Sequence, residues 1–210
     1  MEGELFVVSA PSGTGKTTLV RALFAHHKAV ARELRYSVSH TTRAPRPGEV
    51  HGRDYFFVSA EEFSRLVAED NFLEWAEVYG NCYGSPRGPI MDALARGDSV
   101  AFDIDYQGAV RIREQAPDDS VMVYILPPSL GEMKRRLYAR SQDSEAVIAE
   151  RLGRAKEEVA LWRTFDYVIL NDDFDRAYAE LAHIYHAERL RSLRNAWIEP
   201  MVGDLLEEQI

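Results

Sequence analysis

The sequence predicts an α/β protein in which a parallel sheet is covered by helices on both faces. Short apolar runs rich in β-forming residues alternate with segments of helical periodicity, which is typical of parallel sheets. A glycine-rich stretch, APSGTGKTT at 10–18, joins the first apolar run to the first helical segment. The alternation is broken twice: residues 36–85 predict a mixed-β insertion, and residues 128–163 predict a helical segment dense in charge.

The parallel strands are the short apolar runs that turn-forming residues bound on both sides. They are expected at 4–10, 99–105, 121–126 and 167–170. Apolar residues at helical spacing predict helices at 16–27, 86–97, 130–140 and about 173–194. The last stretch, GDLLEEQI at 203–210, is expected to be a solvated, frayed end.

The insertion is predicted from two alternating segments, at 54–59 and 72–80, with one helix at 61–70. No internal repeat or low-complexity tract interrupts the chain. We therefore divide it into a core formed by 1–35, 86–127 and 164–210, the insertion at 36–85 and the helical segment at 128–163.

The composition is that of a globular protein, with 46% hydrophobic and 28% charged residues. No apolar run approaches the roughly 18 residues that span a bilayer, and the N-terminus lacks a signal-peptide pattern. The single cysteine, Cys82, excludes an internal disulfide framework and a cysteine-based zinc site, and it fits a reducing cytoplasm. The formal net charge of -9 argues against a general nucleic-acid binder.

The stretch at 10–18 supplies glycines, a lysine and a hydroxyl in the order of a phosphate-binding P-loop. Ala10 replaces the first consensus glycine, and Gly15, Lys16 and Thr17 match the end of the motif. An ordinary glycine-rich turn is the alternative, but the motif follows a predicted strand and opens a predicted helix, where backbone N–H groups hold phosphate. We therefore predict a nucleoside triphosphate site formed by Ala10, Pro11, Ser12, Gly13, Thr14, Gly15, Lys16, Thr17 and Thr18.

Asp103 ends the second predicted strand, where P-loop proteins commonly place the carboxylate that orients Mg²⁺. Asp105 lies two residues on and points the same way if the strand continues. An acid that caps the following turn is the alternative. The predicted metal ligands are Thr17 and Asp103, partly through water.

The stretch SVSHTTRAPRPGEVHGRDYFF (37–57) concentrates positive charge and phenol hydroxyls in a segment too polar for a core. Arg43, Arg46 and Tyr55 suit a dianionic phosphate, because guanidinium groups form paired hydrogen bonds and a phenol adds a donor. A solvated basic loop is one alternative, and a nucleic-acid surface, which would need more stacking groups, is another. Since the P-loop already binds one phosphate chain, this segment is expected to bind a second anion.

In these motifs the chain closely resembles guanylate kinases. The resemblance runs in order along nearly the whole chain, through SAPSGTGKTT (9–18), SVSHTTRAPRPGEVHGRDYFFVS (37–59), FLEWAEVYGNCYGS (72–85), DIDYQG (103–108), RRLYAR with the later ERL (135–152) and VILNDD (168–173). It implies Mg²⁺-dependent transfer of the γ-phosphate of ATP to GMP, and by extension dGMP, in cytoplasmic purine nucleotide metabolism. It also implies that the insertion binds GMP, that 128–163 is a lid, and that the chain is a monomer or homodimer without nucleic-acid or membrane partners.

The resemblance also assigns roles to residues, carried over by position. The GMP phosphate would be held by Arg43, Arg46, Tyr55 and Tyr83, and the guanine would be read by Ser39, Glu74 and Asp105. Guanine offers N1–H and N2–H₂ donors to a carboxylate and an O6 acceptor to a hydroxyl, so the assignment makes chemical sense. Arg136, Arg140 and Arg151 match the lid arginines, which with Lys16 and Arg43 form the expected catalytic set, and Asn171 matches a residue near the adenine. The family often has Arg-Gly where this chain has Arg140-Ser141, which leaves the local turn open.

Two other functions remain open at this point. A kinase of sugar phosphates on the same scaffold would need the phosphate ligands but not the guanine readers Ser39 and Glu74. A non-catalytic interaction module, as some guanylate-kinase-like domains are, could dispense with an intact P-loop. Away from these motifs, Glu157 and Glu158 are expected on an exposed helix face, and His26 and His27 at a solvated helix end.

Overall fold

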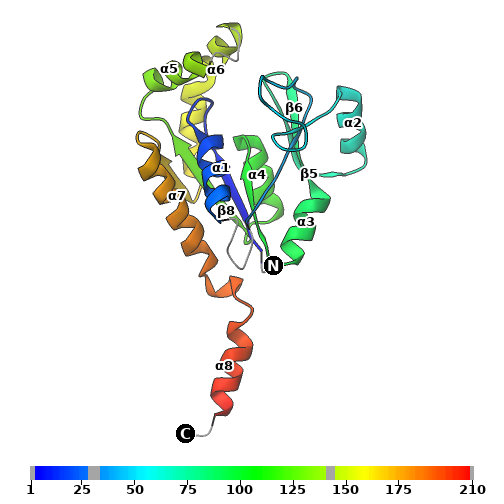
Figure 1. The fold of residues 1–210 in the computed structure, drawn as a ribbon, viewed down its shortest axis with the longest axis vertical. Helices are drawn as coiled ribbons and strands as arrows, with labels where there is room; N and C mark the ends of the chain where they lie inside the picture. Colours follow the sequence, from blue (N-terminus) through cyan, green and yellow to red (C-terminus); the bar gives the residue numbers. More distant parts are fainter. Residues whose placement is uncertain (1–2, 28–33, 141–144, 209–210) are drawn as a thin grey trace.

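The computed structural model describes residues 3–27, 34–140 and 145–208. A five-stranded, fully parallel sheet in the order β2-β7-β1-β8-β9 forms its centre (Figure 1). The strands are β1 (Leu5–Ser9), β2 (Leu34–Tyr36), β7 (Ser99–Asp103), β8 (Ser120–Leu126) and β9 (Tyr167–Leu170). The predicted parallel sheet is confirmed. Strand β2 was not predicted, because three residues are too few to give a recognisable strand pattern.

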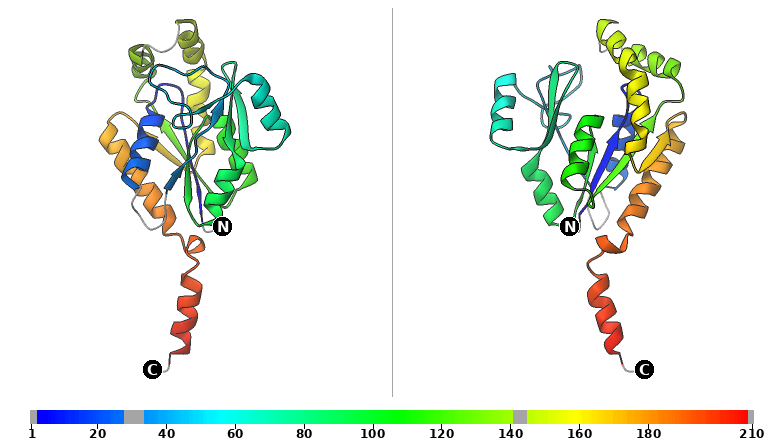
Figure 2. Two further views of the ribbon diagram at one scale, coloured as in Figure 1. Left: turned by 45° about the vertical axis from the view of Figure 1, so that its right-hand side comes forward. Right: turned by 180° about the vertical axis from the view of Figure 1, so that it is seen from behind.

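Helices cover both faces of this sheet (Figures 1 and 2). They are α1 (Lys16–His27) and α7 (Phe174–Arg189) on one face, and α3 (Arg87–Ala95) and α4 (Tyr106–Gln115) on the other. Successive residues of β1 point to opposite faces, so Phe6 packs in the cluster with α1 and α7, whereas Val7 packs in the cluster with α3 and α4. The loop that follows β1 therefore begins at the end of a strand that is buried on both faces.

A second, four-stranded sheet lies beside the first, in the order β4-β3-β6-β5. Its elements are β3 (His40–Thr41), β4 (Phe56–Phe57), β5 (Phe72–Val78), β6 (Asn81–Pro86) and the helix α2 (Ala60–Ala68). The β3–β4 pair is parallel and the other pairs are antiparallel, which confirms the predicted mixed sheet. Ser59 accepts a hydrogen bond from the Glu62 N–H at the start of α2. Phe63 of α2 stacks on Phe72 of β5, with the two ring centres 4.7 Å apart.

The helical segment comprises α5 (Leu130–Arg140), α6 (Glu145–Ala160) and the 3₁₀ turn η1 (Leu161–Thr164). Met133 and Leu137 of α5 pack against Ile148 and Ala155 of α6 in a small core of their own. The two helices lie at the end of the sheet from which the P-loop emerges (Figure 2).

The C-terminal region differs from its prediction. The helix expected to run to about 194 ends at Arg189, and a 3₁₀ turn, η2 (Ser192–Arg194), and a further helix, α8 (Ile198–Glu207), follow it. The frayed end expected from 203 is therefore wrong for most of that stretch, because apolar residues at helical spacing extend the helix. Of the helices that the structure describes, none combines the length and apolar character needed to cross a membrane.

Candidate active site

A cleft of about 1000 Å³ opens between the P-loop, the four-stranded sheet and the helices α5 and α6. The predicted site residues that line it are Ala10, Pro11, Ser12, Gly13, Thr14, Gly15, Lys16, Thr17, Thr18, Ser39, Arg46, Tyr55, Glu74, Tyr83, Asp103, Asp105, Arg136 and Arg151. Arg43 and Asn171 are not part of this lining. The side chain of Arg140 and the whole of Ser141 lie outside the described residues.

The P-loop turns between β1 and α1 on two glycines in the left-handed region, Gly13 at φ +81° and Gly15 at φ +92°. A Cβ on Gly15 would lie 2.6 Å from the Asn171 Nδ2 atom. The buried Asn171 amide donates a 2.6 Å hydrogen bond to the Thr14 carbonyl oxygen. Asn171 therefore holds the P-loop in position through its hydrogen bond to Thr14.

Lys16 is held at the mouth of the loop by two acceptors from the end of β7. Its ammonium group lies 2.9 Å from the Asp103 Oδ1 atom and donates a 2.5 Å hydrogen bond to the Ile104 carbonyl oxygen. The Asp103 side chain is 3% exposed, so its charge acts on Lys16 with little screening by water.

Asp103 also offers an oxygen to a metal. Its Oδ2 atom is buried and has no hydrogen-bond partner in the described part of the chain. Thr17 lies on the same cleft wall, next to Lys16. Among the described residues no three His, Cys, Asp or Glu side chains gather as a metal cluster. A hydroxyl and a carboxylate fit Mg²⁺, which keeps several waters and binds substrate phosphates rather than a full protein cage.

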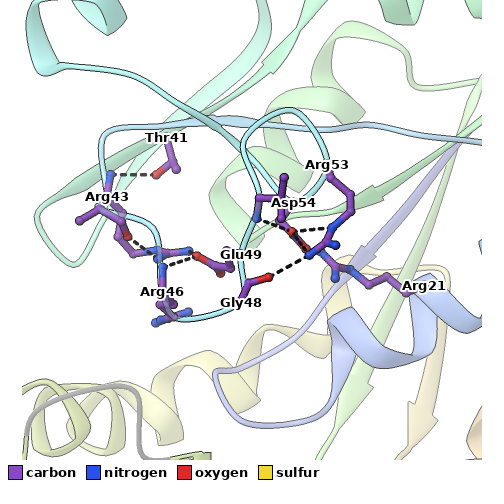
Figure 3. Close-up of polar contacts among 10 residues, drawn as sticks. Arg21, Thr41, Arg43, Arg46, Gly48, Glu49, Arg53 and Asp54 are labelled. Atoms are coloured by element: carbon purple, nitrogen blue, oxygen red, sulfur yellow. Dashed lines mark hydrogen bonds and ion pairs between the residues drawn. The ribbon is translucent and has the colours of Figure 1, made fainter.

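The loop before β4 is held together by two carboxylates, one of which is Glu49 (Figure 3). The Arg43 Nη2 atom donates to both carboxylate oxygens of Glu49, at 2.9 and 3.0 Å, and Glu49 also accepts from the Arg46 backbone N–H at 2.7 Å. Arg43 lines a smaller neighbouring pocket of about 400 Å³, whereas Arg46 lines both pockets. Arg43 is thus paired inside the loop, and its guanidinium carbon lies 5.4 Å from the ring centre of Tyr55, which lines the main cleft.

The second carboxylate, Asp54, ties this loop to the core. It accepts from Arg21 of α1 at 2.6 Å, from Arg53 at 2.9 Å and from the Val50 N–H at 2.8 Å (Figure 3). Burial acts to raise the pKa of Asp54, but these hydrogen bonds outweigh it and lower the pKa to about 2. Arg21 lines the cleft and was missed by the sequence analysis, because nothing local links it to a residue 33 positions away.

Glu74 is a buried carboxylate that faces the cleft from β5. It is 5% exposed and pairs across the sheet with Ser85 of β6, whose hydroxyl donates a 2.5 Å hydrogen bond to Glu74 Oε1. Burial raises the pKa of Glu74 to about 7, against the effect of the Ser85 hydrogen bond and with a further contribution from Asp105. A Cβ on Gly108 would lie 2.5 Å from Glu74 Oε2, so the glycine makes room for the carboxylate.

Asp105 reaches the cleft in a different way from the one expected. The strand β7 ends at Asp103, so the two acids are not related by strand alternation. Asp105 instead caps α4, where its carboxylate accepts from the backbone N–H groups of Gln107 at 3.3 Å and Gly108 at 3.1 Å. Ser39, which is buried, completes the polar lining at this end.

Tyr55 and Tyr83 lie together in the lining of the cleft, with their ring centres 6.0 Å apart. Burial raises the pKa of the Tyr55 phenol, so this hydroxyl remains a hydrogen-bond donor at neutral pH. Arg46 adds a cation to the same wall.

Arg136 links α5 to the P-loop. Its guanidinium donates to the carbonyl oxygens of Thr14 at 3.2 Å and Asn171 at 3.1 Å, and to Glu132 at 2.7 Å. Hydrogen bonds from Arg135 and Arg136 lower the pKa of Glu132 to about 2. The arginine is therefore oriented toward the phosphate loop from the opposite wall.

Two residues at the cleft edge were not recognised from the sequence. Tyr79, at the β5–β6 turn, donates a 2.8 Å hydrogen bond to Glu158 of α6. Glu158 was expected on an exposed face, but it is half-buried, and burial raises its pKa. Glu158 lies four residues after Arg154 and seven after Arg151, so all three residues share one face of α6. This spacing could have identified Glu158 from the sequence as a residue of the cleft edge.

Comparison with known proteins identifies the family to which the chain belongs. The profile of the family described as guanylate kinase matches residues 2–188. The chain is 66% identical to the guanylate kinase of Caulobacter vibrioides over 208 residues, covering 99% of this chain and 96% of the relative, and 50% identical to that of Maricaulis maris, covering 98% and 93%. The crystal structure of guanylate kinase from Anaplasma phagocytophilum aligns with a TM-score of 0.81 and 32% identity, covering 99% and 97% of the two chains. The chain belongs to the guanylate kinase family.

Proposed function

We propose that the chain phosphorylates GMP with ATP, giving GDP and ADP, as part of purine nucleotide metabolism. One observation carries the proposal: a single cleft is lined by the P-loop, the buried carboxylate Glu74, two phenols and Arg46. A P-loop binds a triphosphate, whereas a buried carboxylate fits a base that presents two adjacent donors.

The acceptor nucleotide binds along the insertion. Glu74 accepts from guanine N1–H and N2–H₂, the Ser39 hydroxyl serves O6, and Asp105 supports the same edge. The phosphate is held by Arg46, Tyr55 and Tyr83, and by Arg43 once its guanidinium leaves Glu49. These contacts involve only base and phosphate, so dGMP is a further proposed substrate.

ATP binds on the P-loop side of the cleft, with Asn171 behind the loop. Thr17 and Asp103 hold Mg²⁺, which supplies charge neutralisation on the phosphate chain when it is bound. The acceptor is already an ionised phosphate and needs no strong general base. Catalysis is then in-line alignment with charge neutralisation by Lys16, Arg43, Arg136, Arg140 and Arg151.

In this proposal the chain consists of a core of 1–35, 86–127 and 164–210, a GMP-binding insertion at 36–85 and a lid at 128–163. The insertion and the lid move toward each other when both nucleotides bind, with hinges near 36, 85, 128 and 163. Small-angle scattering with a bisubstrate analogue tests this motion. An unchanged radius of gyration at saturation contradicts it.

A coupled assay of ADP release tests the activity itself. GMP is expected to be the preferred acceptor, with dGMP next and with AMP, UMP and ribose phosphates far slower. Preference for a ribose phosphate would favour a sugar-phosphate kinase on this scaffold. Nucleotide binding without turnover would favour a non-catalytic module. Since ATP and GMP are cytoplasmic metabolites, we place the reaction in the cytoplasm.

A further inference from the structure

Arg21 is a cation in the cleft wall to which the proposed nucleotide binding gives no role. It lies on α1, about one helical turn after Thr17, and its side chain is 44% exposed. The Arg21 Nη2 atom donates a 2.6 Å hydrogen bond to Asp54 Oδ1, which is 33 positions away in the chain (Figure 3). Arg21 therefore joins the helix that follows the P-loop to the loop before β4.

Asp54 is the buried end of this contact. Its side chain is 4% exposed, and it also accepts from the Val50 N–H at 2.8 Å and from the Arg53 Nε atom at 2.9 Å. Val50 and Arg53 belong to the same loop as Asp54, so they order the loop but do not fix its distance from the core. Among the donors that the structure describes at this carboxylate, Arg21 alone comes from the core.

The contact between Arg21 and Asp54 is ionic at neutral pH. Burial acts to lower the pKa of Arg21, but the hydrogen bond to Asp54 and the interaction with Tyr36 outweigh it and raise the pKa. The pKa of Asp54 is about 2, so its carboxylate is ionised as well. A hydrogen bond between two charged groups is stronger than a neutral one, and it holds its two partners in a defined geometry.

Tyr55 follows Asp54 directly, and its backbone is held on both sides. On one side, Asp54 is tied to α1 through its side chain. On the other side, the Phe56 N–H donates to the Ser39 carbonyl oxygen at 2.9 Å, within the four-stranded sheet. The Tyr55 carbonyl oxygen also accepts from the Gly52 N–H at 2.9 Å, which closes the turn before it. The place of Tyr55 therefore depends on both the sheet and the contact with α1.

The Tyr55 phenol lines the cleft close to the end of β7. Burial and, after it, the charge of Asp103 raise the pKa of this phenol, so the carboxylate that holds Lys16 acts on it. The same ring lies 6.0 Å from that of Tyr83, measured between the ring centres. Because residues 54 and 55 are adjacent, a loss of the contact between Asp54 and α1 would let this phenol move relative to the P-loop.

We propose that Arg21 is a positioning residue for phosphoryl transfer, a role that rests on the proposed binding of GMP along the insertion. Through Asp54 it holds the Tyr55 hydroxyl, and with it the acceptor phosphate, at a fixed place relative to the P-loop. A misplacement of about 1 Å can cost on the order of a hundredfold in rate, so a small shift of the acceptor phosphate matters. Arg21 acts through the carboxylate and does not touch the phosphate itself.

Steady-state kinetics with GMP and ATP varied separately test this role. Arg21→Met keeps the apolar stem and removes the charged hydrogen bond, so kcat/KM for GMP is expected to fall about ten- to thirtyfold, while the KM for ATP changes less than about twofold. Arg21→Lys keeps the charge and should recover part of the loss. Arg53→Met removes the other, more exposed arginine from the same carboxylate and is the matched control, with a loss of less than about threefold. Equal losses in Arg21→Met and Arg53→Met overturn the proposal.

A double-mutant comparison separates positioning from a general loosening and from direct contact with the phosphate. In a Tyr55→Phe background the hydroxyl that Arg21 places is absent, so Arg21→Met is expected to lower kcat/KM for GMP by less than about threefold. An undiminished effect in that background overturns the positioning role. Asp54→Asn weakens the same link from its other end and should resemble Arg21→Met. Full activity in Asp54→Asn would mean that Arg21 acts on the phosphate directly, which also overturns the role.

The wild type separates this role from the proposed function. A wild type that does not phosphorylate GMP overturns both, whereas a wild type that does so, with Arg21→Met indistinguishable from it, overturns only the role of Arg21. In Arg21→Met the Asp54 carboxylate keeps Arg53 and the Val50 N–H, so the variant is expected to fold. Melting curves check this, and Arg21→Lys, with an intermediate loss, provides the same comparison in a chain that keeps the charge.

Discussion

The Tyr79 hydroxyl donates a hydrogen bond of 2.8 Å to Glu158, a residue 79 positions away in the chain. Tyr79 lies at the turn between β5 and β6, and Glu158 lies on α6. The guanidinium carbons of Arg151 and Arg154 each lie 5.2 Å from the centre of the tyrosine ring. The contact joins the β5–β6 turn to α6 at the edge of the cleft, so it is positioned to couple the proposed movements of the insertion and the lid.

Replacing Tyr79 with Phe tests this coupling. The ring and its contacts with Arg151 and Arg154 remain, but the hydrogen bond to Glu158 is lost, at a cost of about 1 kcal/mol. We expect kcat/KM for GMP to fall by about three- to tenfold, and a non-hydrolysable ATP analogue to improve GMP affinity less than in the wild type. Tyr178→Phe on α7, away from the cleft, is the control. Equal effects in the two variants would refute the coupling.

Glu74→Gln separates base recognition from stability. The amide presents a donor to the donor edge of guanine, and the charge-assisted bond is lost, so kcat/KM for GMP should fall by about thirty- to a thousandfold, with little gain for AMP. Gln still accepts the Ser85 hydroxyl hydrogen bond. If GMP turnover stays within about threefold of the wild type, Glu74 does not read guanine.

The raised pKa of Glu74 also predicts a pH dependence. Because the folded-state pKa of about 7 lies above the usual value of 4.5, the stabilising contribution of Glu74 is fully present below pH 4.5 and is lost as the pH rises through 7. At pH 8 the Glu74→Gln variant should therefore be more stable than the wild type, by up to about 3 kcal/mol in the free energy of unfolding, and should melt at a higher temperature. At pH 4.5 the two proteins should melt at similar temperatures. Wild-type kcat/KM for GMP should rise through pH 7 as the carboxylate forms. Melting curves of both proteins check the predicted loss of wild-type stability above pH 7, and pH–rate profiles check the predicted rise in kcat/KM.

In the proposed binding mode the phosphate groups of the two nucleotides occupy separate parts of the cleft, so Lys16→Met should abolish transfer and leave GMP binding measurable. The lost charge should cost roughly 3–5 kcal/mol of transition-state stabilisation. Steady-state assays give kcat, and calorimetric titration gives GMP affinity. Lys134→Met, an exposed lysine on α5, is the matched control. Turnover close to that of the wild type would remove Lys16 from the proposed chemistry.

His27 and His186 predict a sensitivity to mild acid. His27, expected to be solvated, is buried, and its Nε2 atom lies 2.8 Å from His186 Nε2, so one ring must donate and the other accept. Burial lowers the pKa of His186, and the charges of His27, Arg189 and His183 lower it further. The contribution of His186 to stability is thus present above about pH 6.5 and lost as the pH falls. Melting temperatures should depend less on pH between 7 and 5 in His186→Gln than in wild type, whereas His183→Gln should follow the wild type.

The sequence predicted those parts of the molecule that local patterns encode. The helix at 130–140 and the strand at 167–170 have the predicted bounds, because apolar spacing and turn residues define both. The P-loop residues were located by their motif. The contacts of Tyr79 with Glu158 and of Arg21 with Asp54 were not foreseen, since each depends on the packing of distant elements. The helix α8 was missed because its acids and Gly203 suggested a solvated end and outweighed the apolar spacing.

The four-stranded sheet has aromatic contacts outside the core of the large sheet, and this has a consequence for local unfolding. Phe63 stacks on Phe72 and His40 stacks on Phe56, apart from the two clusters that enclose β1. Such a sheet opens with a smaller free energy than the sheet on which the P-loop rests, so its amide hydrogens should exchange faster with solvent. If GMP binds at Glu74 as proposed, it should raise that opening free energy. The ligand would then order the unit that recognises it.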